Sequence, residues 1–235
     1  MDEIFIRKAN LSPTKQFISG ILAGAYIAFG AQAANIVGSY MPNPGLVAGL
    51  IFPTGLILVV LAGAELFTGN CLMIMTLLRK KITPSKLLRS WFVVYAGNLA
   101  GGVLIAWLLS GQLSPAVREY TIKVAMNKSS LSFVDAFIRG LLCNWLVCLA
   151  VFMSFKADST IGTVAVLFFP VWLFIASGFE HSVANMYYIP AGIFAEGATL
   201  SGLINNLLPV TLGNIVGGAG FVGILYSFLT PSQPS

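Results

Sequence analysis

Uncharged apolar runs dominate the chain, and their lengths predict membrane-spanning helices. Four stretches are almost free of charge: residues 17–37, 45–78, 90–117 and 197–235. Together they contain one charged residue, Glu65. A helix that crosses a bilayer needs roughly 20 apolar residues. The pattern predicts an all-α integral membrane protein with six transmembrane helices, at about 17–37, 46–78, 90–110, 133–154, 160–195 and 207–229.

The second and fifth apolar runs are too long for one crossing, and they share a motif. Each contains a Glu followed five residues later by an Asn: Glu65 and Asn70 in the second run, Glu180 and Asn185 in the fifth. Unwound backbone at bilayer depth is tolerated only where it is buried in protein or lines a wet cavity. We therefore predict that helices 2 and 5 are broken at these motifs and face one pathway.

A second motif, Gly-Asn-x-x-Gly-Gly, also occurs twice, at residues 97–102 and 213–218. From the Glu of the first motif to the Asn of the second there are 33 positions in one copy and 34 in the other. Three spans per half require the halves to have opposite orientations. The chain therefore predicts one transmembrane channel domain, residues 1–235, built as a 3+3 inverted repeat over about 15–117 and 131–230. In such transport proteins the site lies near the bilayer midplane.

Composition and charge support a membrane protein with a defined orientation. The chain is 57% hydrophobic and 9% charged, whereas soluble domains carry about 25% charged residues. With the N-terminus inside, nine basic residues fall on inner segments and four on outer segments. The positive-inside rule then predicts a multi-pass protein of the inner (plasma) membrane with cytoplasmic N- and C-termini. This asymmetry accounts for the net charge of +5, so we expect no nucleic-acid partner.

His181, the only histidine, lies beside Glu180 in the longest apolar run. An imidazole can offer a proton or a positive charge to an anion inside the membrane; the alternative is a packed histidine bonded to a backbone carbonyl. Glu65 and Glu180 are candidates for a proton relay. We favour a structural role, in which each carboxylate accepts bonds from freed backbone N–H groups and Glu180 also orients His181. One histidine without a Cys-x-x-Cys motif predicts no metal site, and we expect no cofactor.

Further polar, apolar and basic residues near the breaks are candidates for a pore. An apolar pair followed by a hydroxyl, with more apolar side chains upstream, suits a hydrophobic gate with one polar contact: Leu66, Phe67, Thr68, Phe52, Leu56 and Phe174. Packing or lipid contact is the more common role of such aromatics. Lys128 either draws anions to an outer vestibule or is a solvated loop lysine. The three cysteines lie in apolar segments and are expected to be reduced packing thiols.

Several segments resemble the formate/nitrite transporter family. They are Glu65-Leu66-Phe67-Thr68-Gly69, residues 143–150, residues 178–186 and residues 210–215, and the resemblance covers roughly residues 15–230. It implies an aquaporin-like protomer of six helices with one pore, assembled as a homopentamer in the lipid bilayer. Members of the family are not enzymes. They pass small monovalent anions of weak acids, namely formate, nitrite, hydrosulfide and, in some branches, lactate.

The resemblance also implies roles for individual residues. Leu66, Phe67 and Thr68 would form a mobile loop beside the pore. Phe52 and Phe174 would form the outer constriction, and Leu56 the inner one with Asn214 nearby. His181 would be the central histidine, with Glu180 and Asn144 in its hydrogen-bond network, and Lys128 would be the vestibule lysine.

The implied mechanism is a hypothesis with two versions. An anion drawn in by Lys128 would pass a dry constriction toward His181 and Thr68. A bare anion is very costly in apolar surroundings, so either His181 donates a proton and the neutral acid passes, or an imidazolium pairs with the ion. The short loops look closest to the hydrosulfide and nitrite branches, and hydrosulfide is the anion we expect first.

Three alternatives remain open. The first is a proton-coupled formate or nitrite carrier. The second is an aquaporin-type channel for neutral solutes, although Asn70-Cys71-Leu72 and Asn185-Met186-Tyr187 stand where such channels have Asn-Pro-Ala. The third is an intramembrane enzyme, which would need a nucleophile with a partnered base or a set of metal ligands, and one histidine beside a glutamate supplies neither.

Overall fold

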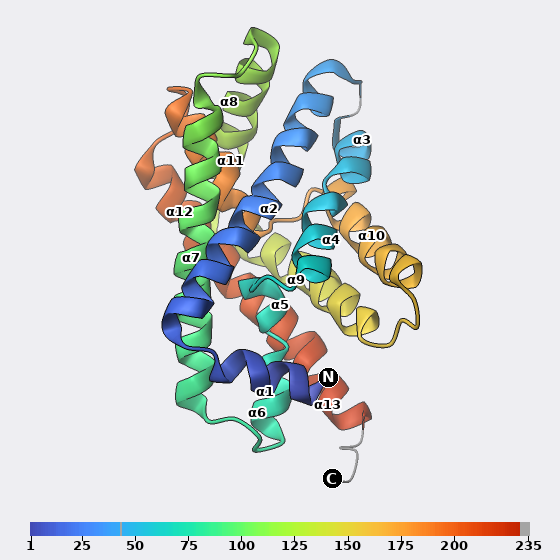
Figure 1. Ribbon diagram of the computed structural model, residues 1–235. Coiled ribbons are helices and arrows are strands. Elements are labelled where there is room, and N and C mark those ends of the chain that lie inside the picture. Colours follow the sequence, from blue (N-terminus) through green and yellow to red (C-terminus); the bar gives the residue numbers. More distant parts are fainter. Residues whose placement is uncertain (43, 231–235) are drawn as a thin grey trace.

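The computed structural model describes residues 1–42 and 44–230, and helices make up almost all of that part of the chain (Figure 1). Five helical segments within it are long and apolar enough to cross a membrane: Pro13–Tyr40, Pro44–Ala62, Pro84–Ser110, Phe133–Ser154 and Leu200–Leu229. Two shorter apolar helical segments, Phe67–Leu78 and Thr160–Ala176, lie next to breaks. The predicted all-α membrane architecture is confirmed.

Helix starts follow from local sequence. Ser12 caps one long helix by accepting a hydrogen bond from the Lys15 backbone N–H, and Thr83 caps another in the same way. A proline at the next position has the backbone angle that a first helical turn requires. The helices of the first half are α1 (Asp2–Asn10), α2 (Pro13–Tyr40), α3 (Pro44–Ile51), α4 (Pro53–Ala62), α5 (Phe67–Asn70), α6 (Met73–Leu78) and α7 (Pro84–Ser110).

The second half differs from the predicted spans at two places. The residues between the third and fourth spans were expected to form a loop, but they form helix α8. The last span contains a π-helix, η1, with wider turns than an α-helix. The elements are α8 (Pro115–Ser129), α9 (Phe133–Ser154), α10 (Thr160–Ala176), α11 (Ser182–Phe194), α12 (Leu200–Ile215), η1 (Val216–Ile224) and α13 (Leu225–Leu229).

Both predicted breaks are present, and a glycine in the left-handed region begins each one. Gly63 ends α4 with φ +73°, and Gly178 follows α10 with φ +68°. Only glycine adopts such angles without steric strain. Leu66 and His181, which precede α5 and α11, are extended. The chain is thus unwound between α4 and α5 and between α10 and α11.

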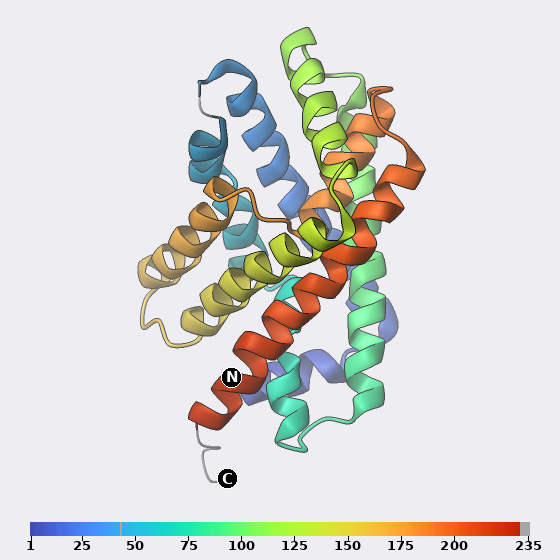
Figure 2. The ribbon, with the colours of Figure 1, turned by 180° about the vertical axis from the view of Figure 1, so that it is seen from behind.

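Small residues allow the long helices to pack closely within each half. A Cβ atom on Gly97 of α7 would lie 3.0 Å from the Cα atom of Gly20 in α2, and one on Gly140 of α9 would lie 3.1 Å from the Cα atom of Val210 in α12. In Figures 1 and 2, α7 rises from the end that holds both termini, whereas α12, η1 and α13 run back toward it. The glycines therefore allow these helices to approach closely.

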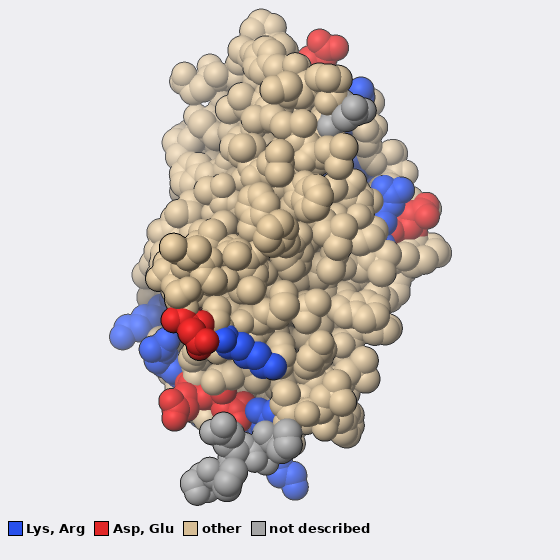
Figure 3. Space-filling model, turned by 90° about the vertical axis from the view of Figure 1, so that its right-hand side faces the viewer, with Lys and Arg blue, Asp and Glu red and all other residues tan. Residues whose placement is uncertain are grey.

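The surface has the character of a membrane protein. In Figure 3 the charged side chains lie mainly toward the two ends of the molecule, and the face between them is almost free of charge. Large apolar side chains are highly exposed, including Ile161 at 83% and Phe228 at 80%. Exposed apolar surface on this scale marks contact with lipid or with other protein.

The N-terminal helix α1 packs its apolar side against the rest of the protein. Phe5 is 1% exposed and packs edge-on against Phe155, with ring centroids 5.6 Å apart. Asp2 forms ion pairs with Arg79 at 3.0 Å and Lys81 at 3.1 Å. Helix α1 is therefore anchored to the connection between α6 and α7 rather than lying free on a membrane surface.

Candidate functional site

One asparagine holds the unwound backbone at each break. The Asn98 side chain accepts a hydrogen bond from the Phe67 backbone N–H at 2.9 Å and donates to the carbonyls of Gly20 and Glu65 at 2.8 and 2.9 Å. Buried backbone groups without partners are costly. The asparagine of the Gly-Asn-x-x-Gly-Gly motif thus supplies the bonds that the broken helix lost.

Asn214 makes the corresponding bonds at the second break. It accepts from the Ser182 N–H at 2.9 Å and donates to the carbonyls of Gly140 and Glu180 at 2.7 and 3.0 Å. We had expected Asn214 beside the inner constriction, but it is fully buried behind the break. The two breaks can be aligned on their glutamates, Glu65 and Glu180. The residue after each glutamate is then Leu66 in the first half and His181 in the second.

The two glutamates also have corresponding partners, although not the predicted ones. Glu65 accepts from the Asn70 side chain at 2.8 Å and lies 3.3 Å from the Lys8 ammonium. Glu180 accepts from Asn185 at 2.6 Å and from Lys128 at 2.9 Å. The carboxylates therefore bind side chains rather than freed backbone N–H groups, and the Glu180 carboxylate is directed at Lys128 and Asn185 instead of orienting the His181 ring.

Lys128 lies in the last turn of α8 and is only 16% exposed. Its ammonium also lies 5.1 Å from the centre of the Tyr188 ring. The alternative of a solvated loop lysine is wrong, because Lys128 is a partly buried ion-pair partner on a helix. Its role at an outer vestibule stays a prediction. Removing one member of such a pair leaves the other charge uncompensated.

Lys8 is the residue that the sequence interpretation missed. It belongs to α1 and pairs with Glu65 as Lys128 pairs with Glu180. A signal was present in the spacing, because Lys8 precedes Gly20 by twelve positions and Lys128 precedes Gly140 by twelve. The correspondence of the halves therefore extends to the helices α1 and α8, which precede α2 and α9.

His181 and Thr68 meet between the two breaks. The Thr68 hydroxyl oxygen lies 2.9 Å from Nε2 of His181, and both residues are buried. On the other side of the ring, Nδ1 accepts a hydrogen bond from the Ala184 backbone N–H at 3.1 Å and so caps α11. An acceptor nitrogen carries no proton, so the neutral ring has its proton on Nε2, which donates to Thr68.

Apolar side chains close the space around this pair. Phe174 stacks on His181 with ring centroids 5.9 Å apart, and Phe52 meets Phe174 edge-on at 5.7 Å. The space is too narrow for a sphere the size of water, and it is lined by Ile27, Phe52, Leu56, Val147, Val171, Phe174 and His181. The expected residues Phe52, Leu56 and Phe174 thus come together at His181, and three aliphatic residues that the sequence did not single out join them.

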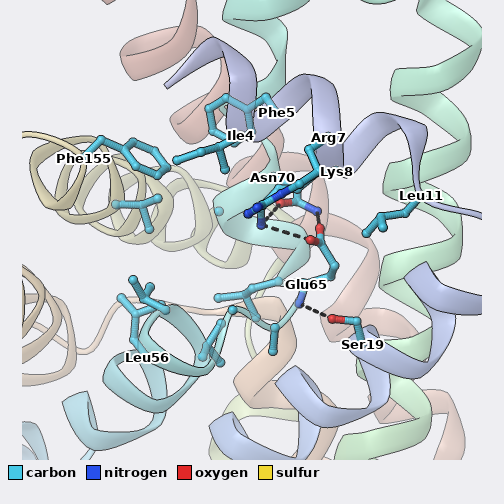
Figure 4. Close-up of a pocket in the computed structure, with 17 residues that line it drawn as sticks. Ile4, Phe5, Arg7, Lys8, Leu11, Ser19, Leu56, Glu65, Asn70 and Phe155 are labelled. Atoms are coloured by element: carbon cyan, nitrogen blue, oxygen red, sulfur yellow. Dashed lines mark hydrogen bonds and ion pairs between the residues drawn. The ribbon is translucent and has the colours of Figure 1, made fainter.

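A larger cavity of about 370 Å³ lies toward the end that holds the termini, beneath α1 (Figure 4). This volume is far above the roughly 15 Å³ that one water molecule needs. Leu56 lines both spaces, so it separates the cavity from the closed space at His181. Figure 4 shows Lys8 beside Glu65 and Asn70 at the wall of this cavity.

The other residues of the expected loop lie apart from His181. Leu66 lines the larger cavity. Phe67 packs edge-on against Tyr95 at 4.9 Å, so it faces α7. The Asn144 amide donates to the backbone carbonyls of Thr68 at 3.3 Å and of Asn214 at 2.7 Å, so it is linked to His181 through neighbouring residues. Of the three residues in the loop, Thr68 is the one for which the described part of the chain shows a hydrogen bond with His181.

Comparison with known proteins assigns the chain to a family. Residues 1–228 match the family model described as formate/nitrite transporter. The chain is 44% identical to the probable formate transporter of Methanothermobacter thermautotrophicus over 90% of this chain and 87% of that protein. Two similar solved structures are an FNT family ion channel (TM-score 0.91, 33% identity, 98% of this chain and 97% of that chain) and a pentameric formate channel with formate bound (0.81, 36%, 92% and 97%).

These matches extend over nearly the full length of the chain, and the two solved structures share its fold. The chain belongs to the formate/nitrite transporter family, whose members are membrane channels and transporters of anions and not enzymes.

Proposed function

We propose that this protein is a pore for small monovalent anions of weak acids, with formate as its first permeant and nitrite and hydrosulfide as further candidates. Hydrosulfide was the first expectation from the sequence, but the relatives that match here are named for formate. We further propose a homopentamer in the inner membrane with both termini in the cytoplasm, by analogy with the pentameric channel and from the distribution of basic residues.

The observation that carries the proposal is the His181–Thr68 hydrogen bond in a closed apolar space. An anion that enters this space can replace Thr68 as the acceptor of the Nε2 proton, and the Thr68 hydroxyl can then donate to the anion as well. The two hydrogen bonds, from His181 Nε2 and from the Thr68 hydroxyl, offset part of the free-energy cost of moving the anion out of water. Phe52, Leu56 and Phe174 exclude water around them.

His181 acts in this scheme as a neutral hydrogen-bond donor. Both versions of the earlier hypothesis need an imidazolium, with protons on Nδ1 and Nε2. A proton on Nδ1 would face the Ala184 N–H and would remove the cap of α11. A proton that accompanies the anion is therefore drawn from the aqueous side in our scheme, while the histidine keeps its own.

Lys8 and Lys128 guide the anion from the two ends. Each lysine is paired with a glutamate, so its charge is balanced locally, but an ammonium has three N–H donors. Lys8 donates to Asn70 and forms an ion pair with Glu65 at 3.3 Å, and Lys128 donates to Glu180. The remaining donors can receive an anion at each mouth. The matching Lys-Glu-Asn groups also support the proposed inverted repeat. In the first half, Glu65 holds the loop of Leu66, Phe67 and Thr68 through its bond to Asn70.

The test is uptake into proteoliposomes that contain the purified protein. Formate, nitrite, hydrosulfide and chloride are supplied one at a time at several pH values, with protein-free liposomes as the control. We expect formate uptake well above the control, little chloride uptake, and faster uptake at lower pH because a proton accompanies the anion. Uptake of all four anions at the rate of the control would refute the proposal.

An osmotic swelling assay in the same liposomes separates the aquaporin-type alternative. We expect water permeability at the level of the protein-free liposomes, because the space at His181 is closed to water. Rapid water flux without a permeant anion would instead favour a neutral-solute channel.

A further inference from the structure

A thiol on α9 binds the backbone of the short helix that carries Thr68. The Thr68 carbonyl accepts a hydrogen bond from the Cys148 thiol at 3.1 Å, and it also accepts from the Asn144 amide at 3.3 Å. Asn144 and Cys148 are four residues apart on α9, so they lie one above the other on the same face of that helix. Two side chains of one helix thus hold a single carbonyl.

Helix α5 needs this external support because it contains only four residues, Phe67–Asn70. So short a helix is unstable by itself. The carbonyl before Thr68 has a thiol donor too, since Phe67 accepts from Cys71 at 3.6 Å. The position of the Thr68 hydroxyl therefore depends on donors behind the helix as well as on His181 in front of it.

The surroundings leave the Cys148 thiol little freedom. Cys148 is 0% exposed. Gly218 of η1 packs behind it, and a Cβ atom there would lie 2.7 Å from the Cys148 sulfur and 2.9 Å from Cβ of Cys71. The thiol is held between η1 and α5. Of its two acceptors, the Thr68 carbonyl at 3.1 Å is nearer than the side-chain oxygen of Asn144 at 3.8 Å.

We propose that Cys148 is a positioning residue of the pore, whose thiol holds the Thr68 carbonyl so that the Thr68 hydroxyl stays on the His181 imidazole. This inference rests on the proposed anion pore. A fixed Thr68 keeps the space at His181 narrow, so it favours the smallest acid anions over larger ones. Without the thiol, we expect α5 to move more and the pore to discriminate less well between small and larger acid anions.

The experiment compares Cys148→Ala with Cys148→Ser, which have nearly the same size and differ in the hydroxyl donor. The measured quantity is the ratio of acetate uptake to formate uptake in proteoliposomes, which does not depend on the amount of folded protein. We expect Cys148→Ala to raise the ratio by about threefold or more, as the loss of one hydrogen bond suggests. We expect Cys148→Ser to stay near the wild-type ratio.

Cys143→Ala is the matched control. Cys143 is also 0% exposed and lies on α9, and within the described residues no hydrogen bond from its thiol is found, so the ratio should stay at the wild-type value. If Cys148→Ala does not assemble, Cys148→Val, which also lacks a donor, replaces it. Equal ratios in the wild type and Cys148→Ala would overturn the inference, and so would equal shifts in the Ala and Ser variants. Failure of the wild type to take up formate would instead overturn the proposed function.

Discussion

Asn98 and Asn214 make equivalent hydrogen bonds at the two breaks. Each replaces backbone hydrogen bonds that a continuous helix would make within itself. Each side chain accepts from the first free N–H of the following helix and donates to two carbonyls. A side-chain amide suits this task because it offers an acceptor and two donors in one plane. The breaks are thus specified by single residues as well as by the glycines before them.

Replacing Asn214 tests this role. Asn214→Ala leaves the buried Ser182 N–H without its acceptor, so we expect the protein to lose about 2 kcal/mol of stability. The measurement is the midpoint of thermal unfolding in detergent, followed by tryptophan fluorescence. Asn205→Ala, at an exposed position of the same helix, is the control. Equal midpoints for the two variants would contradict the assigned role of Asn214.

The sequence predicted part of the arrangement around His181, and its functional role stays a prediction. The motif Glu180-His181 led to the place where the two breaks meet, because a histidine in a long apolar run is easily recognised. The partners of Glu65 and Glu180 were predicted wrongly, since Lys8 and Lys128 come from α1 and α8, outside the apolar runs. Ile27, Val147 and Val171 could not be singled out, because an aliphatic residue that faces a pore has the same pattern as one in a packed interface.

At the scale of elements, α1 is an attached part of the fold. Asp2 joins it to the connection between α6 and α7, and Arg89 donates to the carbonyls of Ala9 and Leu11 at 2.7 and 3.1 Å. Partial burial raises the pKa of Asp2, but the hydrogen bonds and charges of Lys81 and Arg79 lower it more, so the net pKa lies below the ordinary 3.8. The ionised carboxylate therefore stabilises the attachment.

The sign of this shift fixes the pH dependence. A lowered folded-state pKa gives a stabilisation that is complete above pH 3.8 and is lost as the pH falls through the lowered value. At neutral pH we expect Asp2→Asn to raise amide hydrogen exchange in residues 3–10, whereas the exposed Glu3→Gln should have little effect. Wild-type α1 should loosen in the same way only in strong acid. Unchanged exchange in Asp2→Asn would show that the ion pairs do not hold α1.

The contact between η1 and the thiols of α5 and α9 gives another prediction at this scale. In Gly218→Ala the added Cβ would collide with the Asn144 amide and with the Cys148 sulfur, so we expect a clear fall in the thermal midpoint through overpacking. Gly220→Ala in the same element adds a Cβ whose nearest neighbour is 4.0 Å away. If both variants unfold at the same temperature, η1 is not tightly packed against α9.

Long apolar helices and their breaks could be predicted, because bilayer thickness limits the length of a span and the two runs that exceed it share the Glu-x4-Asn motif. Helix α8 could not, because residues 115–129 are polar enough to resemble a loop, and its burial of Val117, Thr121 and Ala125 depends on packing against α11 and α2. The π-helix η1 was also beyond prediction, since its sequence of small and apolar residues fits an ordinary helix.

At the scale of the whole molecule, two similar halves make different contributions to one site. The break in the first half places Leu66 where the second half has His181. The charged groups Lys8-Glu65-Asn70 and Lys128-Glu180-Asn185 remain alike at the two ends. The proposed pore thus has similar mouths and a centre to which the second half brings the only histidine.

Assembly is a prediction at this scale. The wide exposed apolar surface and the pentameric relative lead us to expect a homopentamer. Native mass spectrometry from detergent should give five times the protomer mass of 25.0 kDa. A mass of one protomer over a range of mild detergents would contradict the prediction.

The central claim is that anions pass His181 and use its Nε2 proton as a hydrogen-bond donor. Its most direct test is formate uptake by proteoliposomes with wild-type protein and with His181→Asn, because asparagine can still cap α11 but has no ring nitrogen facing Thr68. We predict a fall in uptake of about tenfold or more, which corresponds to roughly 1.4 kcal/mol, with unchanged assembly and thermal midpoint. Uptake by His181→Asn at the wild-type rate would contradict the account.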